Sequence, residues 1–177
     1  ESIFENTTNL DFEVILVDND SADGSNEIFS KDSRITYINA GDNLGFGKAN
    51  NLGLEHAKGK YIFFLNTDTL LGNNAIKLFF EKMEELPSDV GCLGTILLDA
   101  NGEKTHSYGQ FPTIFNQLKS NTLLSIYKKF FKPKRKFPNE ELFPVEYITG
   151  ADLFVRKSVI DKLGAFDKDF FMYYEET

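Results

Sequence analysis

The residues best suited to chemistry follow two short apolar runs. Residues 61–65 (YIFFL) lead into Asn66-Thr67-Asp68, and residues 13–17 (EVILV) lead into Asp18-Asn19-Asp20. Such runs suit strands buried on both faces of a parallel sheet, and open α/β sheets bind ligands at the carboxyl ends of their strands. We therefore expect both polar ends at one edge of a sheet.

Asn66 and Asp68 offer an amide oxygen and a carboxylate, with no basic residue beside Asp68 in the sequence. These are suitable ligands for Mg²⁺ or Mn²⁺ on a diphosphate, because Mg²⁺ usually takes one or two carboxylates together with phosphate oxygens. The alternative is structural: Asp68 caps the following helix, Asn66 makes a turn, and Asp18 is likewise a cap or turn residue.

The surrounding pattern predicts an α/β fold with a mostly parallel central sheet flanked by helices. Strands and helices alternate along the first half, which implies parallel strands with right-handed connections. The expected strands are 13–17, 34–39, 61–65, 90–98, 145–148 and 152–156, and the expected helices are 26–29, 48–57, 75–85 and 158–163, with weaker helical spacing over 114–131.

Three further segments have a possible chemical role. The glycine pair in residues 41–47 (GDNLGFG) precedes a helix and can present backbone N–H groups to a phosphate, although it lacks the spacing of a dinucleotide site. Glu175-Glu176 follows an aromatic run, and the pair is either a helix start or a general base held against apolar walls. Residues 128–136 (KKFFKPKRK) are either a solvated loop or a contact with an anionic membrane or a pyrophosphate-bearing acceptor.

The composition narrows the class of protein. With 41% hydrophobic residues in 177, the chain has ample material for one globular domain. Its formal net charge of −8 argues against nucleic-acid binding, and the single cysteine, Cys92, excludes an internal disulfide. No signal peptide or membrane-length apolar stretch is visible, so we expect a cytoplasmic protein that contacts the inner face of the membrane through residues 128–136.

Four segments in order resemble the family 2 glycosyltransferases, and most closely the bacterial rhamnosyltransferase-like branch. The segments are VDNDSADGS (17–25), NLGFGKANNLGL (43–54), GKYIFFLNTDT (59–69) and ITGADLFVRKSVIDKLGAFDKDFFMYYEE (148–176). The resemblance implies a GT-A fold in one catalytic domain over residues 1–177. Residues 1–98 would form its nucleotide-sugar-binding half and 99–177 its acceptor-binding half. The family's first strand and the end of its domain would lie outside this chain.

The resemblance also implies roles for individual residues. Asn66 and Asp68 match the metal-binding DxD-type motif, with Asn66 in place of the first Asp, so the metal falls mainly to Asp68. Glu175-Glu176 matches the acidic pair, in which Glu176 is the catalytic base. Donor contacts are implied for Asp18, Asn19, Asn43, Gly45, Asn50, Asn66 and Asp68, and acceptor contacts for Gly150, Ala151 and Asp152, where a surface turn at Asp152 is the alternative.

The implied reaction is metal-dependent inverting transfer of a sugar from dTDP-rhamnose or a UDP-sugar to a saccharide or lipid-linked saccharide in cell-surface polysaccharide synthesis. Two alternatives belong to other classes of protein. One is a catalytically silent module that binds a sugar nucleotide or glycan. The other is a nucleotidyltransferase, which would need a lysine- and glycine-rich loop before the first strand.

Overall fold

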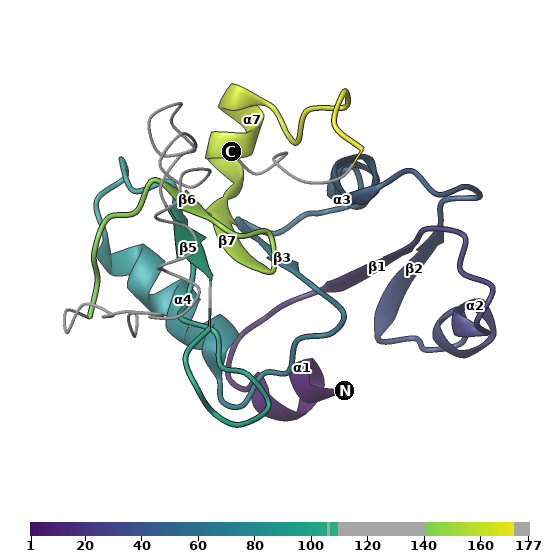
Figure 1. The fold of residues 1–177 in the computed structure, drawn as a ribbon, viewed down its shortest axis with the longest axis horizontal. Coiled ribbons are helices and arrows are strands. Elements are labelled where there is room, and N and C mark those ends of the chain that lie inside the picture. The colour runs from purple at the N-terminus through teal and green to yellow at the C-terminus, as the bar shows by residue number, and fades with distance from the viewer. Residues whose placement is uncertain (106, 110–140, 172–177) are drawn as a thin grey trace, which may run out of the picture.

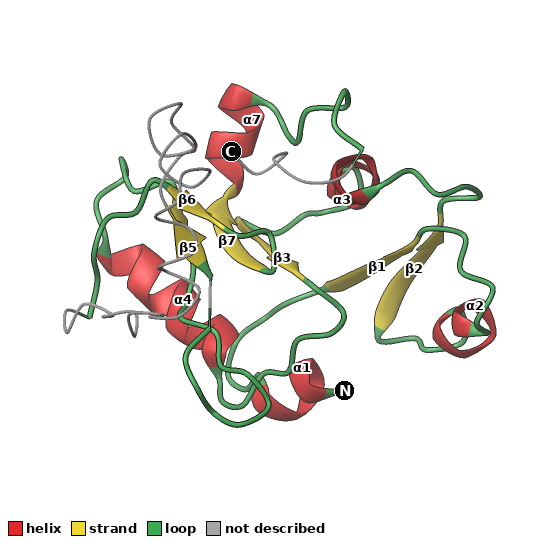
Figure 2. Ribbon diagram, viewed as in Figure 1, coloured by secondary structure: helices red, strands yellow, loops and turns green. Residues whose placement is uncertain are grey.

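The computed structural model describes residues 1–105, 107–109 and 141–171. The strands form the middle of the molecule, with helices α3 and α7 above them and α1 and α4 below them in the view of Figure 1. Figure 2 separates helices, strands and loops in the same view. The helices are α1 (Ser2–Asn6), α2 (Ser25–Phe29), α3 (Phe46–Leu54), α4 (Ala75–Glu85) and α7 (Lys157–Leu163). The strands are β1 (Val14–Asp18), β2 (Ile35–Asn39), β3 (Tyr61–Leu65), β4 (Cys92–Leu93), β5 (Tyr108–Gly109), β6 (Tyr147–Ile148) and β7 (Asp152–Arg156).

The strands pair in both directions, which corrects the expectation of a mostly parallel sheet. β1 and β2 are parallel, in a register that places Asp18 opposite Asn39. β7 lies between β3 and β4 and is antiparallel to both. The short pair β5–β6 is also antiparallel. The expected α/β class holds, but the chain returns through β7 and reverses the strand direction beside β3.

Several predicted elements are confirmed at their boundaries. The strands 61–65 and 152–156 and the helix 75–85 have the predicted limits. The predicted strand 90–98 is much shorter, because only Cys92–Leu93 pairs with β7, and the chain then forms a turn closed by an antiparallel bridge between Leu98 and Lys104. The weak helical spacing at 114–131 lies outside the described residues.

The central strand β3 is apolar throughout because both of its faces are covered. Phe63 lies on one face and packs against Phe79 of α4, with ring centroids 5.2 Å apart. Phe64, the next residue, points to the opposite face and packs against Phe166 at 4.9 Å. Burial on both faces fixes the strand, and so fixes the start of the polar turn that follows it.

The core cluster of buried side chains under β3 consists of Phe79, Met83 and Phe154. The rings of Phe79 and Phe154 are stacked, with centroids 5.2 Å apart and an interplanar angle of 7°. Each buried aromatic side chain of this size contributes roughly 1.5–3 kcal/mol to folding. The cluster holds α4 against β3 and β7.

Arg156, at the end of β7, secures the carboxyl end of α4. Its guanidinium donates to the carbonyl oxygens of Met83 at 2.6 Å, Leu86 at 3.2 Å and Val90 at 2.8 Å. Carbonyls in the last turn of a helix have no partner within the helix, and a cation there also complements the helix dipole. The arginine therefore joins β7 to α4.

Candidate donor and acceptor site

The predicted metal turn lies directly against the predicted acceptor turn. The backbone N–H of Asn66 donates to the carbonyl oxygen of Ala151 at 3.2 Å, continuing the β3–β7 ladder in which Leu65 faces Asp152. The carbonyl of Asn66 accepts hydrogen bonds from the N–H of Thr69 at 3.1 Å and from its hydroxyl at 2.6 Å. Backbone bonds therefore fix the turn, and the two predicted segments meet at the carboxyl end of β3.

Asp68 lies exposed in this turn. Helix α4 begins at Ala75, its N-cap residue is Asn74, and no side chain caps it. Asp68 therefore does not cap the next helix, which removes one structural alternative. The other alternative holds in part, because Asn66 does form a turn through its backbone.

Asp68 and Asn66 suit a metal ion whose remaining ligands come from a bound substrate. Among residues 1–105, 107–109 and 141–171, no three His, Cys, Asp or Glu side chains cluster as a self-contained metal site. Asp68 and Asn66 together offer one exposed carboxylate and one amide, as a Mg²⁺ that shares its coordination with a diphosphate requires.

Asp18 occupies a different environment, because only 6% of its surface is exposed. One carboxylate oxygen accepts the N–H of Ser21 at 2.8 Å and the other accepts the hydroxyl of Tyr37 from β2. The hydrogen bonds from Tyr37 and Ser21 hold the pKa of Asp18 below its usual value. Burial and Asp18 raise the pKa of Tyr37 to about 12. Asp18 therefore braces β1 against β2, and its contact with a donor stays a prediction.

Asn19 connects the end of β1 to the glycine loop. Its side chain accepts the N–H of Leu44 at 3.3 Å and donates to the carbonyl of Gly45 at 3.2 Å. The N–H of Gly45 donates to the side chain of Asn43 at 3.1 Å, and the N–H of Phe46 donates to the carbonyl of Phe171 at 3.1 Å. The N–H groups of Leu44, Gly45 and Phe46 are therefore engaged within the chain, and the donor contacts of Asn43 and Gly45 stay a prediction.

Two adjacent asparagines in α3 have different partners. Asn50, a predicted donor residue, donates to the carbonyl of Phe46 within its own helix at 3.0 Å. Asn51, which the sequence did not single out, binds the backbone of Phe166. The only signal in the sequence was the Asn-Asn pair itself, and it does not reveal a partner 115 residues away.

The acceptor turn packs tightly, and its last predicted residue is buried. A Cβ on Gly150 would lie 2.8 Å from Cζ of Phe46, so the turn closely approaches the start of α3. Asp152 is only 2% exposed, which rules out the surface-turn alternative.

Only one of the two oxygens of the Asp152 carboxylate has hydrogen-bond partners in the described part of the chain. One oxygen accepts the N–H of Thr95 at 2.6 Å and its hydroxyl at 2.8 Å. The other oxygen is buried without a hydrogen-bond partner in the described part of the chain. Burial raises the pKa of Asp152. The structure thus places Asp152 beneath the acceptor turn.

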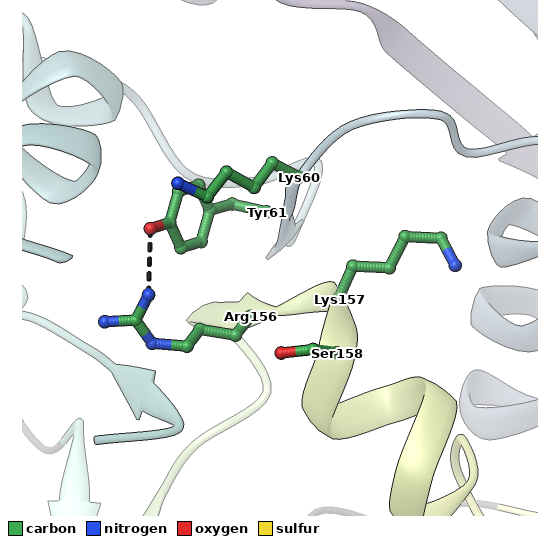
Figure 3. Close-up of a pocket in the computed structure, with 5 residues that line it drawn as sticks. All are labelled: Lys60, Tyr61, Arg156, Lys157 and Ser158. Carbon is green, nitrogen blue, oxygen red and sulfur yellow. Dashed lines mark hydrogen bonds between the residues drawn. The ribbon is translucent and has the colours of Figure 1, made fainter. Parts of the chain in front are cut away.

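A cavity of about 260 Å³ lies at the other end of β3, beside Tyr61 and Arg156. Figure 3 shows its lining, with Arg156 donating to the hydroxyl of Tyr61 at 3.0 Å. The amine of Lys60 pairs with Glu84 and that of Lys157 pairs with Asp161. Since Asp68 follows the opposite end of β3, this cavity is separate from the predicted donor site.

The remaining predictions lie outside the described residues. These are the acidic pair Glu175-Glu176 and the basic segment 128–136. Within the described residues, no helix is both long and apolar enough to cross a bilayer.

Comparison with known protein families identifies the family of this chain. Residues 1–164 match the family model described as Glycosyl transferase family 2. The chain belongs to glycosyl transferase family 2. The resemblance found in the four ordered motifs is thereby confirmed.

Curated relatives of this family 2 chain include rhamnosyltransferases. It is 25% identical over 181 residues to the N-acetylglucosaminyl-diphospho-decaprenol L-rhamnosyltransferase of Mycobacterium tuberculosis, covering 93% of the chain and 58% of the relative. It is 25% identical over 175 residues to the rhamnosyltransferase WbbL of Escherichia coli K12, covering 93% and 63%. The chain thus spans less than two thirds of the length of these relatives.

A solved structure confirms the predicted GT-A fold class. It is the mannosyltransferase PcManGT from Pyrobaculum calidifontis in complex with GDP-Man and Mn²⁺, which superposes with a TM-score of 0.53. The sequence identity is 18%, and the match covers 89% of this chain and 39% of the other. At this identity the likeness shows the fold of the family 2 chain and no more.

Proposed function

We propose that this chain belongs to a glycosyltransferase that moves a sugar from a nucleotide sugar to a saccharide or lipid-linked saccharide. Family membership supports the class of reaction. The hydrogen bond from Asn66 to Ala151 is the observation that carries it, because it brings the turn of an exposed carboxylate against the predicted acceptor turn.

Asp68, with Asn66 beside it, would hold a divalent metal, Mg²⁺ or Mn²⁺, on the donor diphosphate. Bound there, such an ion supplies Lewis-acid stabilisation of the departing nucleoside diphosphate. The exposure of Asp68 and the backbone bonds that fix its turn support this role. The bound Mn²⁺ named for PcManGT is consistent with it.

Glu176, with Glu175 next to it, would remove the proton of the acceptor hydroxyl. The oxygen would then attack the anomeric carbon from the face opposite the diphosphate, which inverts the configuration. The assignment rests on the match of the sequence to the family's acidic pair. Gly150 and Ala151 would line the acceptor side, while Asp152 would support them from below through Thr95.

Asn19, Asn43, Gly45 and Asn50 would shape the donor side by holding the loop before α3. Their observed bonds order that loop, and Asp18 orders the end of β1 beneath it. The donor half, 1–98, and the acceptor half, 99–177, would work as one catalytic domain. Strand β7 of the second half lies between β3 and β4 of the first, which supports a single unit.

The donor we favour is dTDP-rhamnose or a UDP-sugar, and the product a cell-surface polysaccharide. Two relatives are named as rhamnosyltransferases, and one of these names includes a decaprenol diphosphate. An acceptor on such a lipid would place the protein in the cytoplasm at the inner face of the membrane, with residues 128–136 as a contact.

The test is release of nucleoside diphosphate by the full-length protein from dTDP-rhamnose, UDP-glucose, UDP-N-acetylglucosamine and GDP-mannose, with and without Mn²⁺ and a lipid-linked saccharide. Acceptor-stimulated release from one donor supports the proposal. Tight binding of a donor without transfer or hydrolysis would favour the silent binding module.

A further inference from the structure

The loop that carries Asp68 runs from Asn66 to Asn74, between β3 and α4, and contains no helix or strand. Such a loop keeps one conformation only where bonds from other elements hold it. Its first residue is held by the bond from Asn66 to Ala151 beside β7. Its later residues are held by α1, which lies beside the loop below the strands (Figure 1).

Helix α1 binds both backbone polar groups of Leu71. The side-chain nitrogen of Asn6 donates to the carbonyl of Leu71 at 2.7 Å, and the N–H of Leu71 donates to the hydroxyl of Ser2 at 3.2 Å. The same nitrogen of Asn6 donates to the carbonyl of Ser2 at 3.2 Å, one turn earlier in the helix. Residues four apart lie on one face of a helix, so α1 presents both side chains to the loop together.

Burial singles out the same residue of the loop. Leu71 is only 9% exposed, whereas Leu70 before it is 86% exposed. Two adjacent leucines gain equally from burial, so burial alone does not decide which of them turns inward. The bonds from Asn6 and Ser2 hold Leu71 in that place. A shift by one residue would move Asp68 along the loop by about 3.6 Å.

Asp68 lies between the two points at which the loop is held. It follows Asn66 by two positions and precedes Leu71 by three. Since an extended chain spans at most about 3.6 Å per residue, Asp68 is tied within about 11 Å of Leu71. Among the described residues, the next bond from the loop to another segment is that of Asn74 to Thr8. Asn74 lies six positions after Asp68, a tether of up to about 22 Å.

We propose that Asn6 is a positioning residue, which together with Ser2 fixes the loop at Leu71 and so holds the carboxylate of Asp68 in place for a metal-bound diphosphate. This inference rests on the proposed function, because it takes Asp68 as the metal ligand. Asn6 acts through Leu71 and touches neither the metal nor the nucleotide. The position of the carboxylate matters because Mg²⁺ requires near-ideal octahedral geometry.

The first test is hydrogen exchange on the full-length protein and on Asn6→Ala. Loss of the bond to the carbonyl of Leu71 should speed exchange of the backbone amides of residues 69–72 by about fivefold, the equivalent of ~1 kcal/mol. Ser2→Ala removes the acceptor of the Leu71 N–H and should speed the same amides. The amides of β7 should exchange as in wild type, which separates release of the loop from global unfolding.

The matched control is Asn26→Ala. Asn26 is an exposed asparagine in α2, a helix with the same five-residue length as α1. It contributes no side chain to the loop, so exchange at 69–72 should stay as in wild type.

The second test measures the requirement for Mn²⁺ and separates positioning from general stability. It uses whichever of UDP, dTDP and GDP binds wild type with Mn²⁺. In the double variant Ser2→Ala/Asn6→Ala, loss of two bonds should shift the loop toward its open form by about thirtyfold, the equivalent of ~2 kcal/mol. The apparent dissociation constant rises as the fraction of molecules with the loop in place falls. We therefore expect the Mn²⁺ concentration for half-maximal nucleotide binding to rise at least about fivefold.

Saturating Mn²⁺ should restore nucleotide binding in the double variant, because Asp68 itself is still present. A loss of stability alone would lower the amount of protein that binds and leave the Mn²⁺ midpoint unchanged. Asn26→Ala should keep the wild-type midpoint.

Three outcomes would overturn the inference. Unchanged exchange at 69–72 in Asn6→Ala and in the double variant would show that α1 does not hold the loop. Faster exchange with an unchanged Mn²⁺ midpoint would show that the held position does not matter for the metal. The same changes in Asn26→Ala would show an effect that is not specific to α1. If wild type binds no nucleotide with Mn²⁺, the metal role of Asp68 fails together with the proposed function, and the exchange result still decides whether Asn6 holds the loop.

Discussion

Asn66 and Ala151 are joined by a backbone hydrogen bond of 3.2 Å, although 85 positions separate them in the sequence (151 − 66). The bond lies where β3 ends and β7 begins, and it brings a turn with an exposed carboxylate beside a turn shaped by glycine. In a family 2 chain, this places the predicted metal ligand and the predicted acceptor contact at one edge of the structure.

Replacing Asp68 with Asn should remove metal-dependent nucleotide binding and leave folding intact. Asp68 is exposed in the turn after β3 and does not cap α4, so its replacement removes no capping bond from that helix. Surface changes of this kind usually alter stability by at most about 0.5 kcal/mol. The measurements are thermal unfolding and calorimetric titration of nucleoside diphosphate with Mn²⁺. Glu27→Gln, at an exposed carboxylate of α2, is the control and should bind as wild type does. Wild-type binding by Asp68→Asn would remove the metal assignment.

Gly45→Ala should destabilise the protein more than Gly102→Ala. Both glycines have a φ of 78°, and the ψ of −179° at Gly45 lies in a region that only glycine readily adopts, where the backbone alone costs an L residue about 1–3 kcal/mol. A Cβ at Gly102 meets nothing within 4 Å, whereas one at Gly45 meets the carbonyl oxygen of Phe171. Overpacking adds a further ~1–3 kcal/mol, which denaturant unfolding of both variants can resolve. Equal losses in the two variants would mean that Phe171 is not held against the loop.

Asp152→Asn and Asp152→Ala should both gain stability relative to wild type as the pH rises, with Asp152→Ala lower than Asp152→Asn throughout. Burial raises the pKa of Asp152 above its ordinary value of 3.8. Its contribution to stability is therefore full below pH 3.8 and declines as the pH rises through the raised pKa. Asparagine retains an oxygen for Thr95 without the charge, so Asp152→Asn should gain on wild type between pH 4 and pH 7. Alanine also removes the carboxyl that titrates, so Asp152→Ala should gain on wild type with pH in the same way, but it leaves the Thr95 N–H unpaired, at an added cost of about 1–3 kcal/mol at any pH. Urea unfolding across this range checks both, and a constant difference between Asp152→Asn and wild type would contradict the role of burial.

Local patterns in the sequence were enough to predict the elements whose burial is regular. The run YIFFL predicted β3 because both of its faces are covered, by Phe79 on one side and Phe166 on the other. The helix at 75–85 was predicted because its apolar face repeats with helical spacing, and Phe79 and Met83 of that face are buried. The α/β class followed from the order of such segments.

The features that the sequence did not predict are contacts between segments that lie far apart in the chain. The antiparallel return of β7 beside β3 joins residues far apart in sequence, so the alternation of strands and helices did not reveal it. The sequence left the N–H groups of the glycine loop without evident partners, because two of these partners, Asn19 and the Phe171 carbonyl, come from elsewhere in the chain. A surface turn remained an alternative to the acceptor contact for Asp152, because nothing local in the sequence shows its burial against Thr95.

Glu176→Gln should lower the rate of sugar transfer by at least about a hundredfold and leave nucleotide affinity nearly unchanged. General-base catalysis contributes typically 10²–10⁴-fold, and glutamine cannot accept the proton. The measurement is acceptor-dependent release of nucleoside diphosphate, compared with calorimetric affinity for the same nucleotide. Parallel losses of rate and affinity would make Glu176 a structural residue, and Glu175→Gln would then become the variant to measure.

The most direct test of the account is a calorimetric titration of the full-length protein with UDP, dTDP and GDP, each with and without Mn²⁺, repeated on Asp68→Asn. We predict that one nucleotide binds wild type only when Mn²⁺ is present and that Asp68→Asn does not bind it. Binding that is the same without metal, or the same in Asp68→Asn, would contradict a metal-held donor diphosphate at the end of β3.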